Sequence, residues 1–549
     1  MKLLKGGAAL VALLMLASCS NTGLGLNVSD VSGSASDGPH AAADRVIDAT
    51  EISAGQNGTK IVRLDLGNSE IGEYAVPVRG TLVLPTSTSA AEAAPAESGG
   101  AAAKQPLIIV NHLRAPGCSD DTFAYPCTNS TERRFDIGMT YLGEHLAEQG
   151  YAVLIPDLSP VWVGADVASP YDQTKLWQQV VSRFVAEFEN QNSAALQGID
   201  TSQLDTSQLG LVLHSRSGIL VNPAVELFGA ARIKGVLAYG AAYDTFDAEM
   251  LSPAPADVPY LAVSGDLDAD VGASANLWLG AHLGLPRSTP AIAATVPGLG
   301  HMYVNRVLSD AGLDDRIGCE ELDCPDAAEH ERFLREVAAD WFGWAFYGAD
   351  TSIPVTAGEF DGAAELAELA GLPARWLAAS PAASSEQRVT LDAAAFKAFD
   401  GGSATLCVHP DPMQPGQPDN ACPEPTKGVT EVAPVTPVNV LQRARAETTV
   451  TEVRTVAVHV APHGSSELEA DATALLMTLR FADGTTWEQQ LTPAHPVLRN
   501  RATATDNGQY LLGTVRLVVP AEYAGKAVTA VELRAPAAPV ELRAVDLLR

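Results

Sequence analysis

Short apolar runs alternate with amphipathic helical patterns through the first two thirds of the chain. The runs expected to be buried strands are 106–112, 151–157, 208–215, 233–240 and 259–265, and the expected helices are 139–150, 174–191, 216–229 and 327–347. Alternating strands and helices of this kind need parallel strands that are buried on both faces. Residues 59–85 alternate apolar and polar positions, which predicts an antiparallel edge pair. The pattern therefore predicts an α/β fold, with a mostly parallel central sheet flanked by helices over residues 59–349.

The pattern changes in the last third of the chain. Residues 350–385 are rich in alanine, with a helical pattern near Gly362–Gly371, and are expected to be a helical linker. Residues 386–549 consist of short alternating runs separated by Gly, Pro, Asn and Asp, which predicts a C-terminal antiparallel β-sandwich of jelly-roll kind. Such a domain either binds a polymer or braces its neighbour, and the sequence leaves both roles open.

The first residues carry an export signal. Lys2 and Lys5 precede an apolar segment of about ten residues, which is too short to span a bilayer. Small residues before Cys19 resemble a bacterial lipobox, which implies a signal peptide over 1–19 and lipidation of Cys19. Ser20 resembles sorting to the outer membrane of a Gram-negative cell, and residues 20–58 read as a flexible tether. An ordinary signal peptide with an incidental cysteine is the alternative.

The cysteines fit an exported protein. Seven cysteines less Cys19 leave six. An even number in an oxidising compartment predicts disulfides, and local pairing is the simplest arrangement. The expected pairs are Cys118 with Cys127, Cys319 with Cys324, and Cys407 with Cys422. Zinc binding is the alternative, but no C-x2-C spacing supports it.

The charge balance limits the partners. The chain has 66 acidic residues against 35 Lys and Arg, for a formal net charge of −31. So acidic a surface repels polyanions, and we therefore expect no nucleic-acid partner and no binding to anionic lipid headgroups. Attachment to the membrane is expected through the lipid on Cys19 alone. The sequence does not predict the oligomeric state.

Candidate chemistry begins at LGLVLHSRSGIL, residues 209–220. An apolar strand runs into Ser215 and then breaks into small residues, as a strand–turn–helix holding a nucleophile does. That turn usually has glycine two positions before and two after the serine, but this chain has Leu213 and Ser217. Ser217 is the alternative nucleophile. We interpret His214 and His112 as packing residues.

Two further strand ends carry the rest of a catalytic set. The strand 259–265 leads into Asp266-Leu267-Asp268-Ala269-Asp270, and a later apolar run leads to His301. Serine, aspartate and histidine in this order resemble the α/β-hydrolase superfamily, and its esterases and lipase-like members in particular. The resemblance covers residues of about 60–349. It implies Ser215 as nucleophile, His301 as base and Asp268 as its orienting acid, with Asp270 as alternative.

The resemblance also implies an oxyanion hole and a function. The expected donors are the backbone N–H groups of Arg216 and Arg114, with Leu113 as alternative to Arg114. The implied activity is hydrolysis of carboxylic esters through an acyl-enzyme, without cofactor or metal; calcium binding at 266–270 lacks the required Gly and Glu. The short connection between Gly240 and Pro259 leaves no room for a large lid, which favours short-chain or polymeric esters. The alternatives are a peptidase or amidase, and an inactive scaffold.

Overall fold

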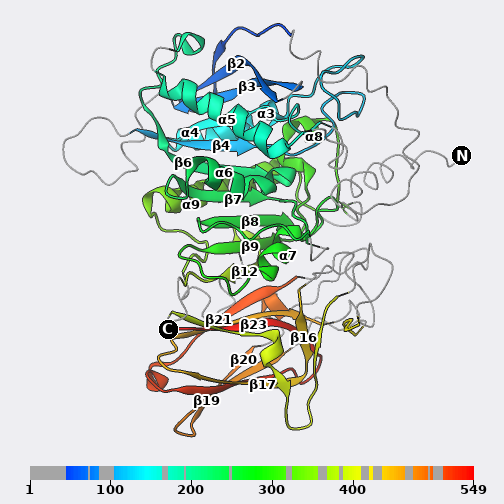
Figure 1. The fold of residues 1–549 in the computed structure, drawn as a ribbon, viewed down its shortest axis with the longest axis vertical. Coiled ribbons are helices and arrows are strands. Elements are labelled where there is room, and N and C mark those ends of the chain that lie inside the picture. Colours follow the sequence, from blue (N-terminus) through cyan, green and yellow to red (C-terminus); the bar gives the residue numbers. More distant parts are fainter. Residues whose placement is uncertain are drawn as a thin grey trace, which may run out of the picture. The chain divides into compact units, whose positions relative to one another are not determined.

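The structure is a computed structural model, whose helices and strands are labelled in Figure 1. The chain divides into two compact units. The residues that it describes are 45–71, 74–85, 104–163, 171–190, 193–245, 250–316, 319, 324–356, 368–382, 387–409, 419–423, 436–463, 474–491, 495–498 and 511–549. Unit 1 comprises the chain up to Ala242 together with His301–Asp315 and Pro325–Asp350. Unit 2 comprises Tyr243–Gly300, Arg316–Cys324 and Thr351–Arg549.

A mixed sheet forms the centre of unit 1. Its strands are β1 Glu51–Ala54, β2 Thr59–Ile71, β3 Tyr74–Pro85, β4 Gln105–Asn111, β5 Ala152–Pro156, β6 Leu204–His214 and β7 Ile233–Tyr239, in the order β1-β2-β3-β5-β4-β6-β7. β4 pairs in parallel with β5 and β6, and β6 in parallel with β7. β1, β2, β3 and β5 pair antiparallel in succession. The predicted parallel strands and the antiparallel edge pair are thus both present.

Most helices of unit 1 lie in the predicted amphipathic segments, but the two short helices Phe135–Gly138 and Arg306–Asp310 were not predicted. The helices are α3 Phe135–Gly138, α4 Thr140–Glu148, α5 Gln173–Glu189, α6 Val221–Phe228, α8 Arg306–Asp310 and α9 Ala327–Tyr347. Asp172 caps α5 by accepting a hydrogen bond from the Lys175 N–H at 3.1 Å, and Asp326 caps α9 through the Glu329 N–H at 2.9 Å. α9 ends at Gly348, whose φ of 66° suits a residue without Cβ.

Ordered structure begins earlier than predicted. β1 lies within residues 20–58, the segment expected to be tether, and pairs Glu51 with Arg63 of β2. Its four residues are all exposed, so no apolar pattern marks the strand. Arg45 adds an ion pair of 2.5 Å to Asp65, which fixes the preceding segment to the bulge in β2.

Unit 2 begins with parallel strands and continues into antiparallel sheets. β8 Tyr260–Gly265 and β9 Ala291–Val296 pair in parallel, with α7 Ser274–Ala281 between them in the chain. β12 Arg375–Ala379 then pairs antiparallel with β9. This corrects the predicted helical linker 350–385, because its described residues contain β10 Glu368–Leu369, β11 Leu372–Pro373 and β12. The described part of the Gly362–Gly371 segment is strand and turn, and residues 361–367 lie outside the described residues.

Two larger antiparallel sheets follow. The first contains β13 Arg388–Asp392, β15 Ala404–Cys407, β16 Val438–Leu441, β18 Thr455–Pro462, β21 Gly513–Val518 and β23 Val540–Leu548. The second contains β14 Lys397–Ala398, β17 Arg443–Val450, β19 Leu475–Phe481, β20 Thr486–Leu491 and β22 Val528–Arg534. Both sheets contribute to one hydrophobic cluster, for example Val458 and Val545 from the first and Leu479 and Val531 from the second.

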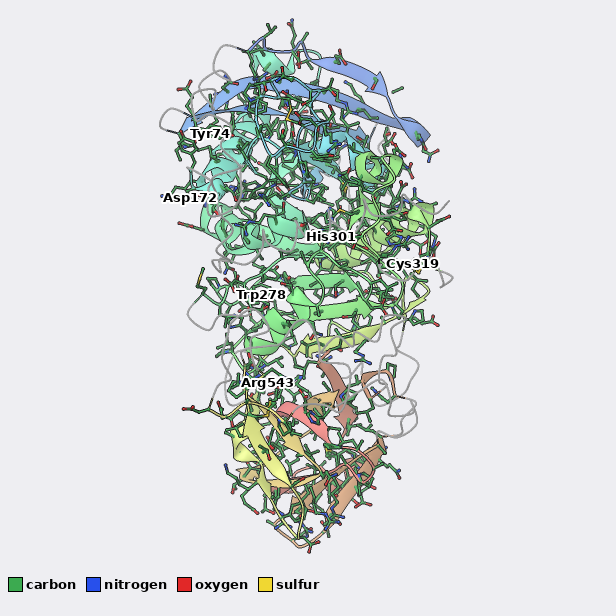
Figure 2. The ribbon with its side chains drawn as sticks, turned by 90° about the vertical axis from the view of Figure 1, so that its right-hand side faces the viewer. Tyr74, Asp172, Trp278, His301, Cys319 and Arg543 are labelled. Carbon is green, nitrogen blue, oxygen red and sulfur yellow. A yellow bond between two sulfur atoms is a disulfide. The ribbon has the colours of Figure 1, made fainter. Side chains whose placement is uncertain are left out.

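Side-chain contacts join the early and late parts of unit 2. The amide of Asn276 on α7 donates to the Leu512 carbonyl at 2.8 Å and accepts from the Leu512 N–H at 3.2 Å. Arg543, labelled in Figure 2, donates to the carbonyl of Gly280 at 2.9 Å. These contacts explain why β8, β9 and α7, expected in a domain ending at 349, belong to the same compact unit as the C-terminal strands.

All three expected disulfides are present. They join Cys118 to Cys127, Cys319 to Cys324 and Cys407 to Cys422, so this prediction is confirmed. The expected signal peptide with Cys19 and the tether as far as residue 44 lie outside the described residues. Among the helices of the described part, none is both long and apolar enough to cross a bilayer.

Candidate active site

Ser215 occupies a strained turn between a strand and a helix. β6 ends at His214, and a 3-10 helix over Ser215–Leu220 leads directly into α6. The φ of Ser215 is 60°, a left-handed conformation that side chains with a Cβ rarely adopt. Its carbonyl accepts a hydrogen bond from the Ala242 N–H at 3.0 Å. Strain of this kind at a strand–helix turn is how a nucleophile elbow presents its serine.

The elbow forms without its usual glycines. Leu213 pairs with Ala238 of β7 on one side and with Asn111 of β4 on the other. The Ser217 hydroxyl donates to the carbonyl of His112 at 2.7 Å and is fully buried. Ser217 therefore ties the elbow to the segment after β4, and its hydroxyl is engaged in that contact.

His214 connects the elbow to the predicted base. Its Nε2–H donates to the carbonyl of His301 at 3.1 Å, and the two rings lie 4.9 Å apart between centroids. Burial, and after it the neighbouring His301, hold the pKa of His214 well below its ordinary value. A neutral His214 does not oppose a positive charge on His301. The residue next to Ser215 is thus buried, as the packing interpretation expects, and its ring also holds the backbone of His301.

A second anchor for His301 comes from Asp315, which the sequence analysis did not single out. Its carboxylate accepts the backbone N–H groups of His301 at 2.9 Å and Met302 at 3.0 Å. These donors stand at the start of a short 3-10 helix, Met302–Val304, where backbone N–H groups lack helical acceptors. The contact joins two loop segments, and no local sequence pattern marks either of them. The sequence alone could therefore not reveal it.

The segment after β4 lies beside the His301 loop. Leu113 and Ala115 share one small hydrophobic cluster with Phe135, Met302 and Leu308. His112 is fully buried; its Nδ1–H donates to the Leu113 carbonyl, and its Nε2 accepts from the Leu158 N–H, both at 2.8 Å. Three loops of unit 1, after β4, after β6 and around His301, therefore meet at one place.

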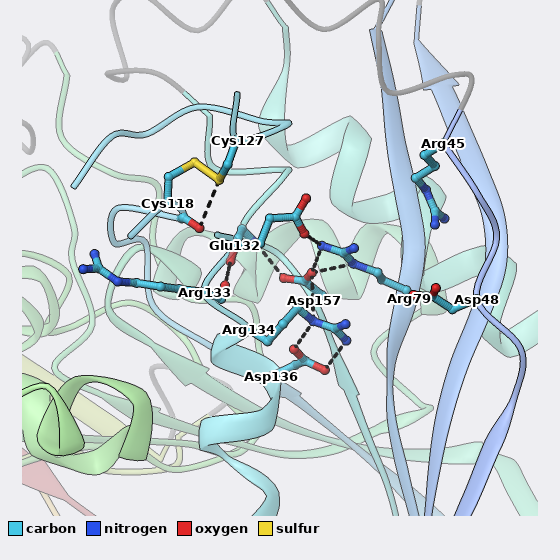
Figure 3. Close-up of polar contacts among 12 residues, drawn as sticks. Arg45, Asp48, Arg79, Cys118, Cys127, Glu132, Arg133, Arg134, Asp136 and Asp157 are labelled. Atoms are coloured by element: carbon cyan, nitrogen blue, oxygen red, sulfur yellow. Dashed lines mark hydrogen bonds and ion pairs between the residues drawn. A yellow bond between two sulfur atoms is a disulfide. The ribbon is translucent and has the colours of Figure 1, made fainter. Parts of the chain in front are cut away.

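A buried ion network supports the segment after β4 (Figure 3). Asp157, at the end of β5, lies 2.8 Å from Arg79 and 3.3 Å from Arg134, and its other oxygen is 3.8 Å from the His112 ring. Arg79 also pairs with Glu132, and Arg134 pairs with Asp136 at 2.8 Å. Burial raises the pKa of Asp157. His112, Arg79 and Arg134 lower the pKa by more than burial raises it, so the pKa of Asp157 lies below its ordinary value.

Asp268 lies in unit 2, in the loop after β8. One carboxylate oxygen accepts the backbone N–H groups of Asp270, Val271 and Gly272 at 3.0, 2.8 and 3.3 Å. Asp266 accepts the N–H of Gly298 at 2.7 Å and so holds the loop that precedes His301. The side chain of Asp268 is thereby fixed, and its expected pairing with His301 stays a prediction, as does the choice of Asp268 over Asp270.

The oxyanion donors also stay predictions. Arg216 follows Ser215 in the 3-10 helix, and Arg114 lies in the segment after β4, with its guanidinium carbon 4.2 Å from the centre of the Phe123 ring. The Cys118–Cys127 disulfide closes the next loop. Over the part of the chain that the structure describes, no group of three His, Cys, Asp or Glu side chains could hold a metal ion.

We expect replacement of His214 to test its positioning role. His214→Leu removes the donor and leaves the buried His301 carbonyl unsatisfied, at a cost of about 1–3 kcal/mol. kcat for an ester should fall about tenfold to a hundredfold with little change in KM. His214→Gln can place an N–H near the position of Nε2 and should restore most of kcat. Equal losses in both variants, with unchanged thermal unfolding, would contradict the role.

Comparisons with known proteins find solved structures of low sequence identity to this chain. No family model matches, and no curated protein matches. Among solved structures, the poly(3-hydroxybutyrate) depolymerase LpqC of Bordetella parapertussis is 16% identical over 46% of this chain and 88% of its own, with a TM-score of 0.26. A CE1 ferulic acid esterase of Anaeromyces mucronatus is 14% identical over 49% and 96%, with a TM-score of 0.26. A CBM27-1 module of Caldicellulosiruptor saccharolyticus, solved with mannohexaose, is 12% identical over 29% and 96%, with a TM-score of 0.19.

Proposed function

We propose that this chain is a serine hydrolase of the α/β-hydrolase superfamily that cleaves carboxylic esters. One observation carries the proposal: Ser215 adopts a left-handed conformation at a strand–helix turn, and the adjacent His214 is hydrogen-bonded to the backbone of His301. An engaged hydroxyl on Ser217 further favours Ser215 as the nucleophile.

The proposed reaction has two stages. Ser215 Oγ attacks the ester carbonyl carbon while His301 takes its proton, and the N–H groups of Arg216 and Arg114 stabilise the oxyanion. The carbon–oxygen bond then breaks, and the alcohol leaves with the proton from His301. Water, deprotonated by His301, attacks the acyl-enzyme and releases the acid and Ser215. Asp268 is proposed to accept the other ring N–H of His301 throughout.

We further propose a C-terminal β-sandwich domain and a lipid anchor for this hydrolase. The C-terminal antiparallel sheets share one hydrophobic core, which supports a β-sandwich domain. Cleavage before Cys19 would leave a lipid-anchored protein of the cell envelope, which we place at the outer membrane of a Gram-negative cell. Short-chain or polymeric esters fit such a location best.

Labelling with a fluorophosphonate probe tests the proposal. An activated serine forms a covalent phosphonate ester, whereas an ordinary buried serine does not react. We expect the adduct on the peptide that contains Ser215, detected by mass spectrometry after digestion. An adduct on the Ser217 hydroxyl would make Ser217 the nucleophile and contradict the assignment of Ser215. No adduct, in a protein that hydrolyses no ester from a p-nitrophenyl series, would favour the inactive-scaffold alternative.

A further inference from the structure

Side chains fix two successive peptide units in the segment after β4. The first unit joins His112 to Leu113, and the second joins Leu113 to Arg114. Both peptide bonds are trans. In a planar trans peptide the C=O and the N–H point in opposite directions. A hydrogen bond to the carbonyl of either unit therefore also decides where its N–H points.

The first unit turns its carbonyl toward the elbow. The His112 carbonyl accepts the Ser217 hydroxyl at 2.7 Å, and Ser217 lies in the 3-10 helix of the elbow. The Leu113 N–H of the same unit therefore points away from that helix. The Leu113 side chain is fully buried in the hydrophobic cluster that contains Met302. Of the two oxyanion donors that the sequence leaves open, this orientation favours Arg114 over Leu113.

The ring of His112 holds the second unit. Its Nδ1–H donates to the Leu113 carbonyl at 2.8 Å, so the Arg114 N–H points away from the ring. On the other side of the ring, Nε2 accepts the Leu158 N–H at 2.8 Å. A carbonyl can only accept and an N–H can only donate, so the ring proton lies on Nδ1 and Nε2 has none. Both the rotation and the tautomer of the ring are thus fixed.

The surroundings keep the His112 ring in this position. His112 is fully buried, and its ring centroid lies 5.7 Å from that of Phe135. Asp157 lies 3.8 Å from Nε2 and accepts the Ser159 N–H at 3.2 Å, which holds the short stretch of backbone that presents the Leu158 N–H. The end of β5 is therefore connected through His112 to the peptide that precedes the Arg114 N–H.

We propose that His112 is a positioning residue of the oxyanion hole. By holding the Leu113 carbonyl, its ring aims the Arg114 N–H at the oxygen that becomes negatively charged in the reaction. The inference rests on the proposed function, in which Ser215 attacks an ester. Donors fixed before the reaction stabilise the developing charge without the cost of reorienting. A peptide that lost its contact with His112 could rotate about its two flanking bonds and turn the N–H away.

Two variants of His112 separate its two contacts. Asn can place an N–H near the position of Nδ1 and keep the contact to the Leu113 carbonyl, whereas Gln can place an oxygen near Nε2 and keep only the contact to Leu158. Complete loss of one oxyanion donor costs about 10²–10³-fold in kcat, so a misaimed donor should cost somewhat less. For a p-nitrophenyl ester we therefore expect kcat to fall about tenfold to a hundredfold in His112→Gln and less than about threefold in His112→Asn. KM should change little in both variants.

Binding of a trifluoromethyl ketone gives a second readout that a merely structural role would not move. Such a ketone forms a negatively charged tetrahedral adduct with a serine nucleophile, which resembles the transition state. Its inhibition constant should rise in His112→Gln by about the same factor as kcat falls. In His112→Asn the inhibition constant should stay close to that of the wild type.

His459→Gln is the matched control. His459 is also fully buried, and its two ring nitrogens lie 2.9 Å from the Thr514 hydroxyl and 3.1 Å from Asp546 in a C-terminal sheet. This variant should lower the unfolding temperature and leave kcat unchanged. Equal kcat in His112→Asn and His112→Gln, or an equal loss of kcat in His459→Gln, would overturn the proposal.

Two further outcomes are distinguishable from these. If His112→Gln does not fold, the ¹⁵N shifts of the His112 ring in the wild type decide. A proton on Nε2 would overturn the proposal, and a proton on Nδ1 together with nearly full kcat in His112→Asn would support it. A wild type that neither hydrolyses esters nor reacts with the fluorophosphonate would refute the proposed function itself, and this inference with it.

Discussion

Ser215→Ala is expected to lower kcat for a p-nitrophenyl ester by about 10⁴–10⁶-fold, the range found when a triad serine is lost. The physical reason is that no other hydroxyl can take its place. Ser217 donates to the His112 carbonyl and lies two residues further along the chain, within the 3-10 helix. KM should change little, because a methyl group in place of the hydroxyl leaves the binding surface intact. Steady-state kinetics at saturating ester measure the effect.

Ser217→Ala provides the matched control. It removes a hydroxyl of the same chemistry two residues away and leaves the buried His112 carbonyl unsatisfied, which should cost about 1–3 kcal/mol of stability. The fluorophosphonate adduct should persist in this variant and disappear in Ser215→Ala. Comparable losses of kcat in the two variants would contradict the assignment of Ser215 as nucleophile.

Local sequence patterns predicted the strands and helices whose packing is simple. β4 and β5 are continuous apolar runs of strand length, and α5 has its apolar positions at helical spacing. β12 was predicted wrongly because alanine favours helices. Its conformation is decided by pairing with β9 and by the hydrogen bond from the Ala378 N–H to Thr514. Such partners are distant in sequence, so no window of residues could reveal them.

In the candidate site, too, the sequence revealed the residue with a local pattern and missed the roles that depend on distant contacts. Ser215 could be located because a strand, a turn and a helix leave a local signal. Asp315, His214 and Asp157 could not be given their roles, because each acts through a contact with a distant loop. A half-buried carboxylate that receives two backbone N–H groups, like Asp315, has the same sequence signature as any exposed aspartate.

Asp157→Asn is expected to destabilise the protein by about 3 kcal/mol at pH 7, since breaking a buried ion pair leaves uncompensated charge. Arg79 and Arg134 keep Glu132 and Asp136 as partners, which limits the loss. Unfolding of the full chain in urea measures the effect. Asp121→Asn is the control, because Asp121 forms an exposed pair with Arg133 at 2.8 Å and should change stability by less than about 1 kcal/mol.

Lowering the pH distinguishes the stabilisation by the negative charge of Asp157 from the stabilisation by packing of its side chain. Its folded-state pKa lies below the unfolded value of about 3.9, so the ionised carboxylate stabilises the fold above pH 4. This stabilisation is lost as the pH falls through the folded-state pKa. Asp157→Asn cannot bind that proton, so the stability gap between wild type and variant should narrow as the pH falls below 4. A gap of constant size between pH 7 and pH 3 would mean that packing, and not the ion network, gives Asp157 its effect.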